Sequence, residues 1–242
     1  MKKLLVTTTL LATAVSLPAT AGATITTKVL DKYLGTNGAV FHSGTVVQSD
    51  IFVTLGGGFY TDVWVSYAAQ GSWQSTFGDE VDLTLGWADT VGAFNVDVGA
   101  AYFNIADDGT GMGDVLQFYL TVDHPIKVGR STVSPFVRAE VYTSSKSGDN
   151  PDNGQFFRGG VMYSTPLAEK WGLSGKAQVS YDTGAFGFTP GTFADVDAKV
   201  TYAVTESFSI SAYGKISTPI STKASDTRST ETAFGMITSW SF

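Results

Sequence analysis

The chain has 242 residues, 43% of them hydrophobic, and its 22 acidic residues outnumber 15 basic ones, so the net charge is −7. That length suits one sizeable domain, and an acidic chain is a poor partner for nucleic acid. The sequence has no cysteine and only two histidines. Disulfides and thiol chemistry are therefore excluded, and we predict no metal site and no cofactor.

The amino terminus has the pattern of a secretory signal. Met1-Lys2-Lys3 is basic, Leu4–Leu17 is apolar, and small residues follow at Ala19-Thr20-Ala21 or Ala21-Gly22-Ala23. We expect residues 1–23 to be removed and residues 24–242 to form one exported domain. No later apolar run approaches the length of a membrane helix, so any membrane crossing must use strands.

From residue 45 onward, apolar and polar residues alternate with the period of two that a β-strand requires. A further strand is expected within Ile25–Phe41, where the alternation is weak, because barrels of this kind have an even number of strands. This gives a total of about twelve strands, with ten as the alternative. The regular predicted strands are Val46–Leu55, Phe59–Ala69, Glu80–Ala88, Ala93–Phe103, Asp114–His124, Thr132–Tyr142, Phe156–Thr165, Lys170–Tyr181, Phe193–Val204, Phe208–Ser217 and Glu231–Phe242.

Three regularities predict an all-β fold, an antiparallel transmembrane β-barrel. The strands have the length that a tilted membrane strand needs. Their connections alternate between short and long, as in Gly56–Gly58, Gln70–Asp79, Asp89–Gly92 and Asn104–Gly113, which is typical of periplasmic turns and external loops. Aromatic residues at strand ends on the apolar face predict interfacial girdles; they are Trp87, Tyr102, Tyr163, Trp171, Tyr181, Tyr202, Trp240 and Phe242.

The last predicted strand ends the sequence on an aromatic residue. Phe234, Met236, Trp240 and Phe242 share one face of this strand. In outer-membrane barrels such a strand closes the sheet, and Phe242 resembles the tag that the barrel-assembly machinery reads. We therefore expect a protein of the Gram-negative outer membrane, in contact with its lipid. The alternative is an edge strand of a secreted β-sandwich.

Several stretches resemble the TorF family of outer-membrane porins. They are Asp31-Lys32-Tyr33-Leu34-Gly35, Gly58-Phe59-Tyr60-Thr61-Asp62-Val63-Trp64, Glu80-Val81-Asp82-Leu83 with Gly86-Trp87, and Phe94 with Asp97-Val98-Gly99 and Tyr102. The resemblance covers roughly the first half of the chain after the signal, and Leu34 stands where that family usually has an arginine. It implies a small outer-membrane barrel with a transport role.

The polar parity of the strands is expected to line the barrel interior. Its charges are acidic in the first half of the chain and mostly basic in the second, which would set an acidic wall against a basic wall. We expect a porin-like channel for passive diffusion of small hydrophilic solutes. The proposed lumen-lining residues are Asp62, Asp82, Asp97, Arg138, Glu140, Arg158, Lys176, Asp197, Lys199 and Lys215.

Two other functions stay open at this point. The first is a structural or adhesive barrel, in which interior charges pair and inward aromatic residues such as Trp64 and Phe136 block the path. The second, less favoured, is an outer-membrane enzyme, which needs a histidine and a serine or acid on one face. His42 directly precedes Ser43, and Asp123 directly precedes His124. Adjacent strand residues point to opposite faces, so no enzyme is predicted.

Two acidic loop segments have a composition that suits Ca²⁺. They are Asp107-Asp108-Gly109 and Asp149-Asn150-Pro151-Asp152-Asn153. Solvated turn residues explain both segments more simply, so no calcium site is predicted.

Overall fold

We describe the protein from a computed structural model, in residues 22–70, 78–105, 114–144, 153–221 and 228–242. Most of the predicted signal peptide and most of the long predicted loops Gln70–Asp79 and Asn104–Gly113 lie outside these ranges, as does nearly all of both candidate calcium segments. Among the described residues, no helix has the length and apolar character needed to cross a bilayer.

Twelve long strands account for most of the described chain. A short hairpin, β2 (Tyr33–Leu34) with β3 (Val40–His42), a three-residue strand β9 (Ile126–Val128) and a 3₁₀ turn η1 (Ala185–Gly187) complete the described elements. The long strands are β1 (Gly22–Leu30), β4 (Val46–Gly56), β5 (Phe59–Ala68), β6 (Glu80–Val91), β7 (Phe94–Ile105), β8 (Val115–Asp123), β10 (Ser131–Ser144), β11 (Gly154–Pro166), β12 (Trp171–Asp182), β13 (Gly191–Ala203), β14 (Phe208–Pro219) and β15 (Glu231–Ser241).

The long strands form one closed antiparallel sheet. Each pairs with the next long strand along the chain, and β15 pairs with β1, so the sheet has no free edge. Ile25 lies opposite Trp240, and the Phe242 amide donates to the Ala23 carbonyl oxygen at 2.9 Å. Closure satisfies the backbone groups that an open edge would leave unpaired, which a strand in lipid requires. The predicted twelve-strand antiparallel barrel is confirmed.

The two faces of the sheet divide apolar from polar side chains. In β8, Leu116, Phe118 and Leu120 are exposed, whereas Gln117 and Tyr119 between them are buried. The same alternation runs around the barrel, and outward residues such as Met236 remain 59% exposed. Apolar surface of this extent is unstable in water and is suited to contact with lipid.

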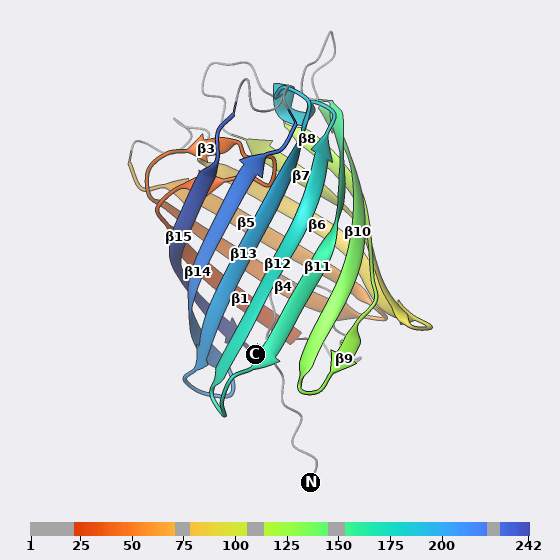
Figure 1. The fold of residues 1–242 in the computed structure, drawn as a ribbon, viewed down its shortest axis with the longest axis vertical. Helices are drawn as coiled ribbons and strands as arrows, with labels where there is room; N and C mark the ends of the chain where they lie inside the picture. Colours follow the sequence, from red (N-terminus) through yellow and green to blue (C-terminus); the bar gives the residue numbers. More distant parts are fainter. Residues whose placement is uncertain (1–21, 71–77, 106–113, 145–152, 222–227) are drawn as a thin grey trace.

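The two ends of the barrel differ, and we call them the turn end and the loop end. Figure 1 shows tilted strands, with the carboxy terminus and β9 at the lower, turn end and with β3 and η1 at the upper, loop end. At the turn end, Gly56, Gly57 and Gly58 all have positive φ. A Cβ added to Gly58 would lie 2.8 Å from the Ala88 carbonyl oxygen, so this turn requires glycine.

The first strand and one connection differ from their sequence-based predictions. β1 begins at Gly22, before the range Ile25–Phe41 in which this strand was expected and inside the segment assigned to the signal, and it ends at Leu30. After Leu30 the chain leaves the barrel wall, which explains the weak alternation there. β6 continues to Val91, so the predicted turn Asp89–Gly92 shortens to two residues around Gly92.

Candidate functional site: the barrel lumen and its mouth

The candidate site is the inner face of the barrel, where charged side chains from both halves of the sheet are buried. Glu140 is 2% exposed, Asp97 3% and Lys199 6%, and the other predicted lumen residues are buried or half-buried. Burial of this degree shows that side chains fill much of the interior. An ionised group that is so poorly hydrated needs a partner, and the two halves of the lumen supply different kinds of partner.

The basic wall is organised by one carboxylate. Arg138 and Arg158 are directly opposite one another on β10 and β11, and like charges in that position repel. Glu140 lies between them, with its Oε1 2.8 Å from Arg138 Nε and its Oε2 2.6 Å from an Arg158 terminal nitrogen. Gln117 Nε2 also donates to Glu140 Oε1 at 2.9 Å. The sequence predicted these three residues only as separate lumen charges, and the structure brings them into one cluster of net charge +1.

Further contacts hold Arg138 and Lys176. Arg138 donates to Thr121 Oγ1 at 3.1 Å, and its guanidinium lies 4.3 Å from the centre of the Tyr119 ring. Lys176 on β12 forms an ion pair of 3.8 Å with Asp197 on β13. The basic wall is therefore partly neutralised by its own acids.

Two carboxylates of the acidic wall have neutral partners instead. Tyr60 donates to Asp97 Oδ1 at 2.6 Å, and Asn95 donates to Asp123 Oδ2 at 3.1 Å. Within the described ranges, neither of these carboxylates forms an ion pair with a lysine or arginine, nor do Asp62 and Asp82. Among the described residues, these four carboxylates therefore lack the cationic partner that Glu140 and Asp197 have on the basic wall.

Some charged residues of the inner face, among them Lys28 and Glu80, were not predicted from the sequence. Lys28 of β1 shares the inward parity with Thr26 and Leu30, both of which are buried, but the weak alternation of this stretch concealed it. Glu80, at the first position of β6, is 6% exposed. It was assigned to a strand but not to the lumen, because a strand terminus gives little information on which face it belongs to.

The mouth loop, residues 31–45, folds into the loop end of the barrel. Leu34, Asn37 and Ala39 are each at most 7% exposed. The ammonium group of Lys215, on β14, donates to the carbonyl oxygens of Leu34 at 3.2 Å and Gly35 at 2.9 Å. The predicted lumen residue Lys215 therefore binds the loop rather than an acid of the opposite wall.

On the other side of the mouth, Tyr33 ties the loop to the acidic wall. Its hydroxyl donates to Glu80 Oε2 at 2.9 Å, and its ring packs against Trp64 with centroids 5.7 Å apart. Burial, with Glu80 beside it, raises the pKa of Tyr33 well above its usual value, so the phenol remains a donor.

An aromatic cluster joins the mouth loop to a second inward segment, the helical loop of residues 183–190. Phe41 packs on Phe188 at 5.6 Å and on Phe186 at 6.2 Å between ring centroids. Phe186 continues to Tyr142 at 4.9 Å and to Phe103 at 6.3 Å on the barrel wall. Aromatic side chains thus extend across the loop end of the lumen, whereas the sequence predicted inward aromatic residues only on the strands, such as Trp64 and Phe136.

The predicted girdle residues lie on the outer face, toward the strand ends. Trp171 packs on Tyr202 with centroids 4.9 Å apart, and Trp240 packs on Phe208 at 4.8 Å, both at the turn end. Tyr102 and Tyr181 lie toward the loop end, each more than two-fifths exposed. Phe242 is 76% exposed. We propose that these side chains lie at the two membrane–water interfaces.

The two histidines lie at opposite ends of the barrel, His42 in the mouth loop and His124 beside the turn end. His124 Nδ1 is 2.8 Å from the Ala93 carbonyl oxygen, while the adjacent Asp123 bonds to Asn95 across the inner face. His42 belongs to the mouth loop. In the part of the chain that the structure describes, no three histidine, aspartate or glutamate side chains are grouped as a metal would require.

Comparison with known proteins identifies the fold. No protein-family model and no curated protein sequence matches the chain. Among solved structures, the NanC porin matches 90% of this chain and 98% of its own length, with a TM-score of 0.56 and 8% identity. The KdgM porin matches 91% of this chain and 99% of its own, with a TM-score of 0.56 and 10% identity. The chain therefore has the fold of outer-membrane porin barrels.

Proposed function

We propose that the protein is an outer-membrane channel for passive diffusion of small hydrophilic solutes. The observation that carries this proposal is the closed barrel whose outer face is apolar and whose inner face is charged on opposite walls. A barrel that needed only to fill its interior would gain more from apolar packing, since buried charges are costly. The solutes would pass between the carboxylates of β4–β8 and the cluster centred on Glu140.

We further propose the origin and assembly route that the sequence suggests. Export by residues 1–23, membership of the TorF family and recognition of Phe242 by the barrel-assembly machinery together form one consistent hypothesis. Phe242 suits such recognition because its side chain is accessible and its backbone is paired with Ala23.

A non-conducting structural or adhesive barrel is the second candidate. It is favoured by the mouth loop, whose aromatic residues pack against the helical loop and the wall. In that case the inward segments would be permanent filling, and only the outer loops would act.

Planar-bilayer recording of the refolded chain under a salt gradient separates the two. Discrete conductance steps with a definite reversal potential are expected for a channel. Silence from protein shown to be folded and inserted would favour the second candidate. Reversing Arg138, Arg158 and Lys176 to glutamate should shift selectivity toward cations, and unchanged reversal potentials would show that these residues do not line the path.

A further inference from the structure

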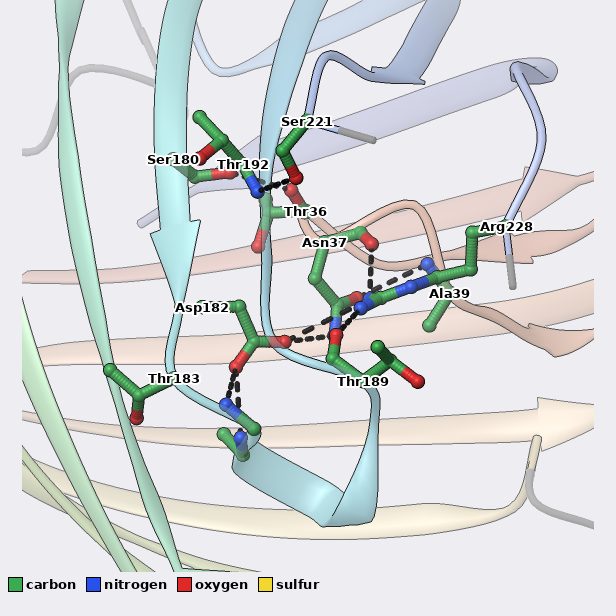
Figure 2. Close-up of polar contacts among 12 residues, drawn as sticks. Thr36, Asn37, Ala39, Ser180, Asp182, Thr183, Thr189, Thr192, Ser221 and Arg228 are labelled. Atoms are coloured by element: carbon green, nitrogen blue, oxygen red, sulfur yellow. Dashed lines mark hydrogen bonds and ion pairs between the residues drawn. The ribbon is translucent and has the colours of Figure 1, made fainter. Parts of the chain in front are cut away.

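One arginine joins three segments at the loop end of the barrel. Arg228, between β14 and β15, donates from one terminal nitrogen to the Asn37 carbonyl oxygen at 2.6 Å and from the other to the Thr189 carbonyl oxygen. It also forms an ion pair of 3.8 Å with Asp182 at the end of β12. Figure 2 shows the guanidinium between the mouth loop, the helical loop and the wall. The side chain is only 8% exposed, so these contacts are shielded from water.

Asp182 fixes both loops from the opposite side. One carboxylate oxygen accepts the Asn37 side-chain amide at 3.2 Å, and the other accepts the backbone amides of Gly184 at 2.7 Å and Ala185 at 2.8 Å (Figure 2). Its side chain is fully buried. A buried carboxylate with three donors and a guanidinium is well satisfied, and removal of one partner leaves the others uncompensated.

The position of Arg228 is also set by aromatic packing. Its guanidinium lies 4.2 Å from the centre of the Phe193 ring and 5.5 Å from that of Phe188. Such cation–π contacts strengthen when they are desolvated. Burial lowers the pKa of Arg228, and the neighbouring Asp182 opposes that shift.

The acceptors of Arg228 on the loops are backbone carbonyl groups, so the contact depends on where the chain lies. At Gly38, next to Asn37, φ is +69° and an added Cβ would lie 3.3 Å from the Phe193 ring. The mouth loop therefore passes close against β13 at the point where Arg228 binds it. Without Arg228, Asn37 and Thr189 lose the one side chain that the structure shows bonding to both.

We propose that Arg228 is a positioning residue that holds the mouth loop and the helical loop across the lumen, so that its release opens the loop end of the barrel. This inference rests on the proposed channel for its effect on conductance. Its effect on loop position is independent of any channel. The sequence concealed the role, because Arg228 lies in a segment with no periodicity and 191 residues from Asn37.

The test compares R228A with R228K and with R130A, an exposed arginine in the turn at the other end of the barrel. The chain has no cysteine, so A39C introduces a single thiol at a loop position that is 2% exposed. We expect R228A to speed the reaction of this thiol with a membrane-impermeant maleimide by about tenfold or more, the effect of losing charge-assisted hydrogen bonds. R228K should react at a rate between those of the parent and R228A, because one ammonium group cannot reproduce the forked hydrogen bonds of a guanidinium. R130A should react at the rate of the parent.

Conductance provides the second readout. R228A should raise the unitary conductance about twofold or more if the two loops obstruct the path. An oxidised G38C/S217C pair should reverse that rise, since a Cβ at Gly38 would be 3.5 Å from Ser217 Oγ, and reduction should restore it. If Arg228 only stabilised the barrel, oxidation of this cysteine pair would not change the unitary conductance of R228A.

The outcomes separate the two hypotheses. Maleimide reaction unchanged in folded R228A overturns the positioning role, whatever the conductance. Faster reaction in R228A with every variant electrically silent supports the positioning role and refutes the channel. If R228A fails to fold, R228K becomes the test, since it changes only the guanidinium that bonds to Asn37 and Thr189, and labelling of R228K at the parent's rate would then overturn the role.

Discussion

Replacing Glu140 with glutamine removes one negative charge from between two arginines whose nitrogens lie 2.8 and 2.6 Å away. The substitution preserves the size of the side chain and keeps an oxygen that accepts the hydrogen bond from Gln117. The cluster formed by Arg138, Arg158 and residue 140 then carries a charge of +2 instead of +1. If solutes pass this cluster, the channel should become more selective for anions.

The size of the shift follows from Coulomb's law. One unit of charge changes the energy of a monovalent ion about 7 Å away in water by about 0.6 kcal/mol, a factor of about 2.7 in its local concentration. The local concentration of anions rises by this factor and that of cations falls by it, so without screening the anion-to-cation permeability ratio increases about sevenfold. At 0.1 M salt the Debye length is about 10 Å, which reduces the expected change to about threefold.

The assay is the reversal potential of refolded E140Q under a salt gradient, compared with the parent and with E206Q. Glu206 is exposed in the turn that joins β13 to β14, at the turn end of the barrel. E206Q therefore changes the net charge by the same amount without altering the lumen. E140Q should also unfold at a lower urea concentration, because two half-buried arginines then have no carboxylate between them. A reversal potential that is equal in both variants, with E140Q demonstrably folded, would refute a path beside Glu140.

Three further outcomes are expected. Deleting Phe242 should greatly reduce assembly into the outer membrane of cells, measured by heat-modifiable electrophoretic mobility. It should lower the stability of the refolded barrel only a little, since the Phe242 side chain is 76% exposed. Assembly equal to that of the parent would contradict the role of Phe242 as a tag. G235A should lower the free energy of unfolding, measured with urea in lipid vesicles, by about 1–3 kcal/mol or more, because its Cβ would lie 2.1 Å from the Val29 carbonyl oxygen. The control G159A should leave this free energy unchanged, since its Cβ would have no neighbour nearer than 3.9 Å. Y33F removes the hydroxyl that donates to Glu80, a hydrogen bond worth about 1 kcal/mol. The thiol of A39C should therefore react about fivefold faster with maleimide when Y33F is added. An unchanged rate would show that this hydrogen bond does not hold the mouth loop.

The sequence alone determined the architecture, because a strand in lipid must obey a strict period of two. In β8 the order Leu116, Gln117, Phe118, Tyr119 already divides lipid-facing from inward residues, and the outcome agrees with that division. Apolar outward positions and an even number of strands leave few topologies, so strand count and antiparallel order followed from local pattern. Near the first strand the alternation is weak, and the sequence placed that strand only within the broad range Ile25–Phe41, whereas β1 spans Gly22–Leu30.

Only the tertiary structure decided which inward groups meet. Glu140 is two residues from Arg138, but its contact with Arg158 depends on the register of β10 with β11. The inward fold of the mouth loop left even less trace, because Asn37 is fixed by Asp182 and Arg228 from distant parts of the chain. Periodicity reports the environment of regular strands. Contacts between loops depend on side chains that barrel closure brings together from distant parts of the chain, so local periodicity cannot predict them.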